Sequence, residues 1–245
     1  METHAAILLI ADLHLSEQQP RLTQAFLDLL QAHQQRSTDL YVLGDWFNAW
    51  LDDADDSAWL EPIVSALQRF TACGNRVFVL VGNRDFVLGQ DFLNRFGGHL
   101  LQEPHCLIWH GQRVRLEHGD ALCVDDVSYQ RFKRFIRHPL ILGTLKRLPF
   151  GFKQGIAQWL RSKSKQRQQQ RHYQIIDVNL AYVDRQMHDI DVLIHGHTHN
   201  PDIHHLKDGK QRIVLGDWRE EAGEAQILYL PAKASDAWQL SVWRF

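Results

Sequence analysis

The stretch Asp191-Val192-Leu193-Ile194-His195-Gly196-His197-Thr198-His199 decides the fold of this chain and points to its chemistry. An apolar run that stops at a polar turn is typical of a buried β-strand. Four earlier runs, at residues 7–14, 40–45, 77–83 and 114–118, end in the same way. Strands of one sheet that stop at the same edge bring their loops together. The polar ends of these five runs are therefore expected to meet in one cleft.

Seven side chains at these strand ends carry oxygen or nitrogen atoms that bind metals. They are Asp12, His14, Asp45, Asn83, His118, His197 and His199. Asp12 and His14 are two residues apart, so in an extended segment both point to the same side and one metal can take both. Asp45 has two carboxylate oxygens and could bridge two metals. Carboxylate, amide and imidazole donors suit Mn²⁺, Fe²⁺ or Zn²⁺, and paired divalent metals are a means of cleaving phosphate bonds.

Each of these residues has an ordinary structural explanation when taken alone. An Asp or Asn after Gly at a strand end is usually a turn residue or a helix cap, and a single His is more often structural than functional. The metal interpretation therefore depends on all five segments ending together.

Helical and strand-like patterns alternate along the chain. Helical spacing at residues 20–35, 57–72, 91–96 and 173–188 separates the strand candidates, and residues 106–110 and 112–116 indicate a hairpin. The last third predicts strands at 203–206, 212–215, 225–230 and 238–245. An alternating start with a strand-rich end predicts an α/β fold of two packed sheets with helices outside.

A basic segment interrupts this plan. Residues 127–176 contain 12 Lys and Arg and no Asp or Glu, in a chain whose formal net charge is −2. Such asymmetry predicts an anionic partner. Apolar clusters broken by Pro and Gly predict a cap of two or three amphipathic helices at 127–171, inserted into a core of 1–126 and 172–245. A basic amphipathic cap also predicts salt-sensitive association with an anionic membrane surface.

Cysteine spacing and hydropathy indicate the cellular compartment in which the protein works. Cys73, Cys106 and Cys123 have no paired spacing, which argues against a disulfide framework and favours a reducing compartment. No apolar run reaches the ~18 residues that span a bilayer, and residues 5–11 lead directly into Asp12, as a first strand would. We expect a cytoplasmic protein that associates peripherally with the cytoplasmic face of the inner membrane.

The polar strand ends form an ordered set of motifs. Asp12-Leu13-His14, Gly44-Asp45, Gly82-Asn83, His118-Gly119-Asp120 and Gly196-His197-Thr198-His199 resemble the five blocks of the calcineurin-like metallophosphoesterases. The resemblance implies a four-layer αββα sandwich. It also implies one metal held by Asp12, His14, Asp45 and His199, and a second held by Asp45, Asn83, His118 and His197. His195 is then expected to be structural or to support a ligand.

One departure from that superfamily narrows the resemblance. Arg84 stands after Asn83, where most metallophosphoesterases have a His that acts as general acid. The segments 82–86, 44–50 and 118–126, with the basic insert, make the chain similar to the UDP-2,3-diacylglucosamine pyrophosphohydrolases of lipid A biosynthesis. That family implies two Mn²⁺ or other divalent metals and attack of water on the α-phosphorus of a UDP-linked diacyl glucosamine lipid. The products would be UMP and 2,3-diacylglucosamine 1-phosphate (lipid X).

The same resemblance implies roles for individual residues. Asn83, Arg84 and His118 would be catalytic, and the substrate would contact Asn83, Arg84, Asp126, Tyr129, Arg161, Ser164, Lys165, Gln168, Arg171 and His197. Asn and Lys are usual in the family where Gln168 and Arg171 stand here. Arg84 is permanently charged, so it can hold two phosphate oxygens but cannot act as an acid. The leaving group is itself a phosphate and needs little protonation.

Three other functions remain open on the sequence. The chain could hydrolyse a soluble nucleotide such as a dinucleoside polyphosphate, which would not need an apolar cap. A metal-free scaffold that binds proteins would have lost ligands, and here all seven are present. A nucleic-acid binder could use the aromatic residues of the basic segment for stacking, but no nuclease-specific feature accompanies them. We expect no nucleic acid and no obligate protein partner. Oligomeric state, acyl-chain preference and the roles of His195 and Asp217 stay open.

Overall fold

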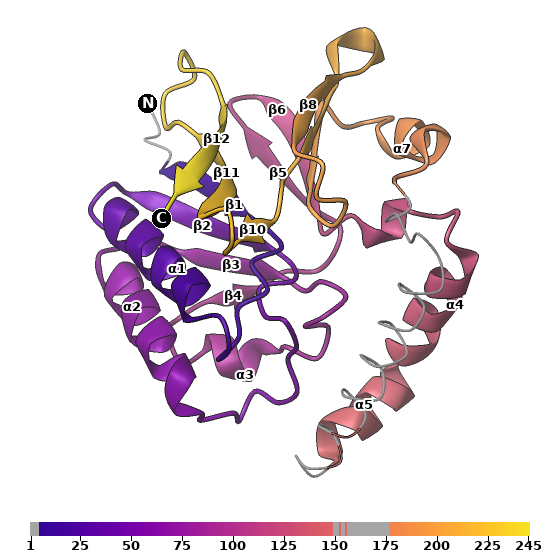
Figure 1. The fold of residues 1–245 in the computed structure, drawn as a ribbon. Coiled ribbons are helices and arrows are strands. Elements are labelled where there is room, and N and C mark those ends of the chain that lie inside the picture. Colours follow the sequence, from indigo (N-terminus) through magenta and orange to yellow (C-terminus); the bar gives the residue numbers. More distant parts are fainter. Residues whose placement is uncertain (1–4, 149–151, 153–154, 156–176) are drawn as a thin grey trace.

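Two β-sheets pack face to face between layers of helices (Figure 1). The computed structural model describes residues 5–148, 152, 155 and 177–245. The first sheet has the strand order β10-β11-β1-β2-β3-β4, with β12 paired to β11, and the second has the order β5-β6-β7-β9-β8. This arrangement confirms the predicted α/β fold of two packed sheets.

The strands are short and almost all lie where the apolar runs predicted them. The first sheet comprises β1 (Ala6–Ile10), β2 (Thr38–Leu43), β3 (Val77–Leu80), β4 (His99–Leu100), β10 (Trp218–Arg219), β11 (Glu224–Leu230) and β12 (Gln239–Arg244). The second comprises β5 (His105–Trp109), β6 (Gln112–Glu117), β7 (Val192–His195), β8 (Asp202–His205) and β9 (Gln211–Val214). The two-residue strands β4 and β10 were not predicted, because two residues are too few to show a period.

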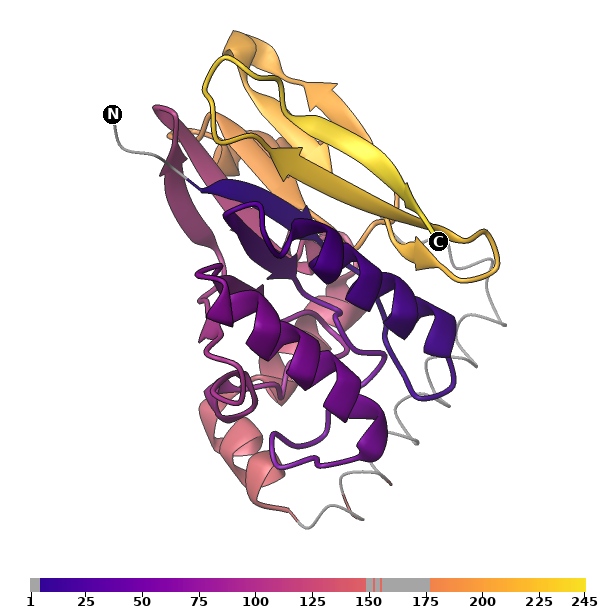
Figure 2. The same cartoon turned by 90° about the vertical axis from the view of Figure 1, so that its left-hand side faces the viewer.

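The helices lie outside the two sheets (Figure 1). They are α1 (Pro20–His33), α2 (Glu61–Ala72), α3 (Gln90–Leu93), α4 (Val127–Ile136), α5 (Pro139–Arg147) and α7 (Leu180–Gln186), with 3-10 turns at Ala58–Leu60, Asp120–Leu122 and Lys207–Gly209. Helices α1 and α2 lie side by side in both ribbon views (Figure 2). Helices α4 and α5 extend away from the sheets on the side of α7 (Figure 1). In the part of the chain that the structure describes, no helix is long and apolar enough to cross a membrane.

Alternation along β1 shows how the layers are built. Leu8 and Ile10 pack with α1 and α2, whereas Ile7 and Leu9 face the second sheet, as the two-residue period of a strand requires. Because both faces of β1 are buried, its sequence is apolar throughout. A third cluster, including Val183 of α7, covers the other face of the second sheet. The molecule therefore has the four layers expected of an αββα sandwich.

Helix α7 is shorter than predicted. The side chain of Asn179 accepts a hydrogen bond from the Tyr182 N–H at 2.9 Å and so caps a helix that begins at Leu180. Residues 177–179 are not helical, and residues 173–176 of the predicted helix lie outside the described residues. The Asn179 cap therefore sets the start of α7, although the apolar residues keep their helical spacing on both sides of it.

Parallel pairing brings the motif-bearing loops to one edge. Strand β2 pairs in parallel with both β1 and β3 in the first sheet. Strand β7 pairs in parallel with both β6 and β9 in the second. Ligand sites in sheets of this kind form where the carboxyl ends of strands meet. The loops after β1, β2, β3, β6 and β7 carry the five sequence motifs.

Candidate metal centre

The backbone of the motif loops is unusual. Eight described residues other than Gly have a positive φ, and five of them are predicted metal ligands: Asp12 (54°), His14 (52°), Asp45 (50°), His197 (68°) and His199 (54°). Left-handed backbone is uncommon for residues with a side chain. Where it persists, it clusters at functional sites, because the surrounding structure holds it there. The left-handed backbone is therefore concentrated at residues that the sequence predicted to be metal ligands.

The loops are held together by hydrogen bonds and by close approach at glycines. Asp12 N–H donates to the Gly44 carbonyl at 3.1 Å, and His197 N–H donates to Asp12 Oδ2 at 2.7 Å. A Cβ at Gly82 would lie 2.2 Å from Asp45 Oδ1, and a Cβ at Gly196 would lie 2.3 Å from Asp12 Oδ2. Only Gly can occupy these two positions without displacing a carboxylate.

Asp12, His14 and His199 form a first group of metal-binding atoms. Their donor atoms lie within 4.8 Å of one another, and His199 Nε2 is 3.3 Å from Asp12 Oδ1. Both ring nitrogens of His14 are buried without a hydrogen-bond partner among the described residues. Buried polar atoms normally have partners. A cation bound between these side chains would provide one.

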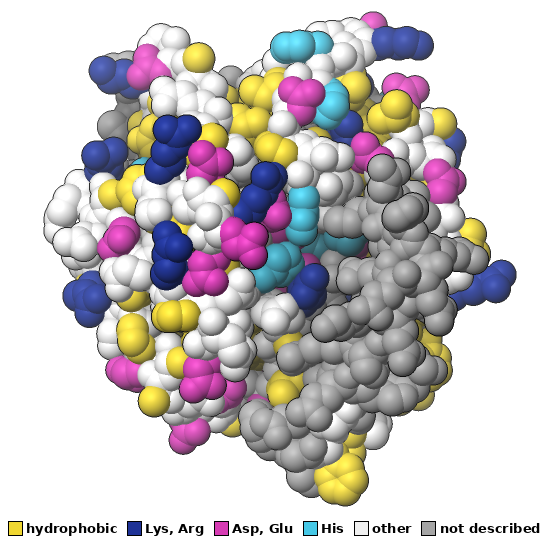
Figure 3. Space-filling model, viewed as in Figure 1, with side chains coloured by type: hydrophobic (Ala, Val, Ile, Leu, Met, Phe, Trp, Pro, Cys, Tyr) yellow, Lys and Arg dark blue, Asp and Glu magenta, His cyan; other side chains and the backbone are white. Residues whose placement is uncertain are grey.

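Asp12, Asp45 and His118 form a second group within the same 4.8 Å limit. His118 Nε2 lies 3.7 Å from Asp45 Oδ1 and 3.0 Å from Asn83 Oδ1. The His197 ring is beside it, with 5.1 Å between ring centroids. The structure thus brings all seven predicted ligands together, and Asp12 belongs to both groups. Asp45, the residue expected to bridge the metals, belongs to the second group, and its Oδ2 lies 3.9 Å from His14 Nδ1. In Figure 3, viewed from the same side as Figure 1, histidine side chains gather with acidic and basic ones near the middle of the molecular surface.

Burial and mutual charge set the protonation of these groups. Burial lowers the pKa of His14 to about 3 and that of His197 to about 4, so both imidazoles are neutral and able to bind a metal. Burial raises the pKa of Asp45 to about 7. Burial opposes a charge on His118, but Asp45 and Asp12 raise its pKa to about 9. A cation binding here would displace this proton, since a metal ligates the neutral imidazole.

Arg84 lies at the rim of this cluster. Its backbone N–H donates to Asp45 Oδ1 at 2.8 Å, and its Nη1 donates to Asn48 Oδ1 at 2.8 Å. The side chain is 42% exposed, and its Nε is 3.5 Å from Asp45 Oδ2. A permanent positive charge therefore stands beside the predicted ligands and remains accessible to solvent.

The predicted substrate contacts outside the motifs are placed only in part. Asp126 caps α4 by accepting the Tyr129 N–H at 2.9 Å. The Tyr129 hydroxyl donates to Asp120, and its ring stacks on His197 with 6.4 Å between centroids. Arg161, Ser164, Lys165, Gln168 and Arg171 lie outside the described residues.

Three acidic residues support the ligands. The sequence left the role of Asp217 open and did not predict the roles of Asp85 and Glu103. Asp85 is buried and accepts the N–H groups of Gly82 at 2.7 Å and Trp46 at 2.8 Å. Glu103 Oε1 accepts the His118 N–H at 2.7 Å, and Asp217 Oδ2 is 3.4 Å from His199 Nδ1. Asp85 stands in the Asn-Arg-Asp motif and could have been found from it. Glu103 belongs to no motif.

His195, for which the sequence left open a structural role or the support of a ligand, is buried beside Gly196 and Arg212. Its Nδ1 bonds to the Gly196 carbonyl at 2.8 Å, and Arg212 Nη1 lies 3.4 Å from its Nε2. Burial lowers the pKa of His195 to about 3, so the ring is neutral.

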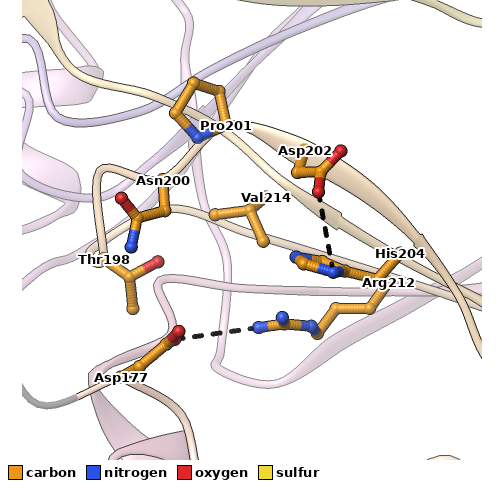
Figure 4. A pocket seen from close by; sticks show the side chains of 8 residues that line it. All are labelled: Asp177, Thr198, Asn200, Pro201, Asp202, His204, Arg212 and Val214. Atoms are coloured by element: carbon orange, nitrogen blue, oxygen red, sulfur yellow. Dashed lines mark ion pairs between the residues drawn. The ribbon is translucent and has the colours of Figure 1, made fainter.

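A cavity of about 310 Å³ lies beside Arg212 (Figure 4), lined by Asp177, Thr198, Asn200, Pro201, Asp202, His204, Arg212 and Val214. The seven ligands do not line this cavity.

Comparison with known proteins agrees with this geometry. The family model described as calcineurin-like phosphoesterase matches residues 5–201. The chain belongs to this family. Membership implies divalent metals, and the two groups formed by Asp12, His14, Asp45, His118 and His199 are a candidate site for them. The resemblance that the five motifs predicted is confirmed.

Two curated relatives share most of their length with this chain. A protein of Pseudomonas fluorescens (strain SBW25) is 41% identical over 226 residues, covering 90% of this chain and 91% of the relative. One of Pseudomonas entomophila (strain L48) is 42% identical over 226 residues, covering 90% and 94%. Both are named UDP-2,3-diacylglucosamine hydrolase.

A solved structure supports the fold. The crystal structure of a dimetal phosphatase from Danio rerio superposes with a TM-score of 0.51 at 15% identity, covering 94% of this chain and 93% of the other. At that identity the likeness shows a shared fold.

Proposed function

We propose that this chain hydrolyses the pyrophosphate bond of UDP-2,3-diacylglucosamine, giving UMP and 2,3-diacylglucosamine 1-phosphate (lipid X) in lipid A biosynthesis. The observation that carries the proposal is the meeting of all seven predicted ligands beside Arg84. The names of relatives that are 41% and 42% identical over 90% of this chain support the choice of substrate.

We propose two Mn²⁺ as the resident metals. Asp12, His14, Asp45 and His199 would hold metal one, and Asp45, Asn83, His118 and His197 would hold metal two. The two ring nitrogens of His14, buried without a partner among the described residues, and the mixed oxygen and nitrogen donors fit such ions. When bound, paired divalent metals lower the pKa of water to about 7 and so supply an attacking oxygen at neutral pH.

Catalysis by the chain itself falls to Asn83, Arg84 and His118. The Nδ1 of His118 is fixed by the Leu43 carbonyl at 2.9 Å, which leaves Nε2 directed at Asn83. Arg84 would hold two oxygens of the α-phosphate and stabilise the charge that develops there. It keeps its proton, so the phosphate leaving group departs without a general acid.

The core at 1–126 and 172–245 would carry the metals, and the cap at 127–171 would select the lipid. Asp126 and Tyr129, with Arg161, Ser164, Lys165, Gln168 and Arg171, are the proposed contacts of its head group. Phe135 and Leu140 of the cap are 63% and 76% exposed and would face acyl chains or lipid.

We propose peripheral binding to the cytoplasmic face of the inner membrane. Flotation with vesicles that high salt leaves unchanged would contradict its electrostatic part.

Hydrolysis of UDP-2,3-diacylglucosamine in ¹⁸O-labelled water, followed by phosphorus NMR, tests the reaction. Attack on the α-phosphorus places the label in UMP, whereas label in the lipid product would refute the proposed direction of attack. Diadenosine tetraphosphate should be assayed beside the lipid. Faster hydrolysis of this soluble nucleotide would overturn the substrate assignment.

A further inference from the structure

One face of helix α4 is joined to the loops that follow β3 and β6. Tyr129, Lys133 and Arg137 are spaced four residues apart and therefore lie on the same side of the helix. The Tyr129 hydroxyl donates to Asp120, and Lys133 Nζ lies 2.7 Å from Asp120 Oδ1. The Gln130 side chain donates to the Asp120 carbonyl at 2.7 Å. The start of the cap is thus fixed to the segment just after His118.

Arg137, at the end of the same helix, bridges two loops at once. Its Nη2 donates to the Gly82 carbonyl at 2.7 Å, one residue before Asn83. Its Nη1 lies 3.6 Å from Glu103 Oε2. The other oxygen of Glu103 accepts the His118 N–H at 2.7 Å. A single guanidinium therefore connects the backbone positions of two predicted ligands of metal two.

The charges in this contact are balanced and mostly shielded from water. Asp120 is fully buried, and the side chains of Lys133, Glu103 and Arg137 are 12%, 13% and 22% exposed. Lys133 Nζ is 3.8 Å from Glu103 Oε2, so two cations face two carboxylates. Removing one member of such a partly buried set leaves its partner uncompensated, which is costly. Two basic residues of the cap, Lys133 and Arg137, therefore pair with carboxylates of the protein itself.

We propose that Arg137 is a positioning residue for the second metal, holding Asn83 and His118 in place and coupling the cap to the metal centre. The inference rests on the proposed assignment of metal two. Groups that orient metal ligands without touching the metal typically change metal affinity by about 10- to 100-fold. By linkage, a metal that needs this arrangement also stabilises the docked position of α4.

Titration of metal-free full-length protein with Mn²⁺, with free Mn²⁺ followed by electron paramagnetic resonance, tests this role without substrate. We expect Arg137→Met to weaken the second binding event by about tenfold or more and to leave the first unchanged. Arg137→Lys keeps the charge but has no planar fork to bridge both loops, so it should weaken the second event as well. Arg134→Met, on an exposed position of the same helix, is the matched control and should bind as wild type does.

The sign of the effect separates positioning from charge alone. Removing a nearby positive charge would by itself strengthen binding of a cation. Equal or tighter binding of the second Mn²⁺ by both Arg137 variants would overturn the inference. Wild-type protein that binds fewer than two Mn²⁺ would instead overturn the proposed metal centre. If Arg137→Met does not fold, as judged by circular dichroism, Arg137→Lys carries the test.

Discussion

Replacing Gly82 with Ala should disable the metal centre while leaving the fold intact. The added Cβ would lie 2.2 Å from Asp45 Oδ1 and 2.4 Å from the Asp45 backbone nitrogen, whereas ordinary van der Waals contact begins at 3.4 Å. Because one of these neighbours is backbone, a side-chain rotation cannot relieve the overlap. One of the two loops must move by roughly 1 Å, a displacement that typically costs about 100-fold in rate. That factor corresponds to about 2.7 kcal/mol of transition-state stabilisation.

Two measurements on Gly82→Ala check this reasoning. The first is kcat for UDP-2,3-diacylglucosamine at saturating Mn²⁺, which should fall by about two orders of magnitude. The second is the number of Mn²⁺ bound, which should fall because Asp45 is the ligand that we propose the two metals share. Gly143→Ala is the control for metal binding, since a Cβ there meets nothing within 4 Å. Wild-type kcat and metal content in Gly82→Ala would refute the argument from close approach.

Three further predictions follow from buried groups and from the rim of the site. Asp85→Ala removes the acceptor of three buried N–H groups, those of Gly82, Trp46 and Phe47. It should lower the free energy of unfolding in urea by about 3 kcal/mol, and an unchanged midpoint would contradict this. Arg84→His should not raise kcat/KM for the UDP-lipid, since the leaving group needs no acid; a clear gain would refute it. Burial lowers the pKa of His33 although the Leu29 carbonyl opposes the shift, so the unfolded chain binds this proton more tightly. Stability should therefore fall as pH drops below about 6.5, and less steeply in His33→Gln; an equal slope would count against burial as the cause.

The sequence was most informative where a buried strand ends. Asp12, Asp45 and Asn83 follow apolar runs that can only be central strands, and parallel pairing of β1, β2 and β3 places them at one edge. That much follows from hydropathy and from the rule that parallel strands share an edge. The left-handed backbone of Asp12 and Asp45 could not be predicted, because their residue types do not require it.

Contacts between distant segments could not be predicted from the sequence. Glu103 lies before β5 in no recognisable motif, and only the folded chain shows that it accepts the His118 N–H. The count of basic residues predicted an anionic partner for the insert. Lys133 and Arg137 have such partners within the protein, in Asp120 and Glu103. Charge composition reports how much charge a segment carries, whereas packing decides what that charge faces.

Anomalous diffraction at the manganese absorption edge, from crystals of the Mn²⁺-loaded protein, tests the central claim most directly. Two strong peaks should flank Asp45, one among Asp12, His14 and His199 and the other among Asn83, His118 and His197. A single peak, or none beside Asp45, would contradict a dinuclear centre built at the strand ends.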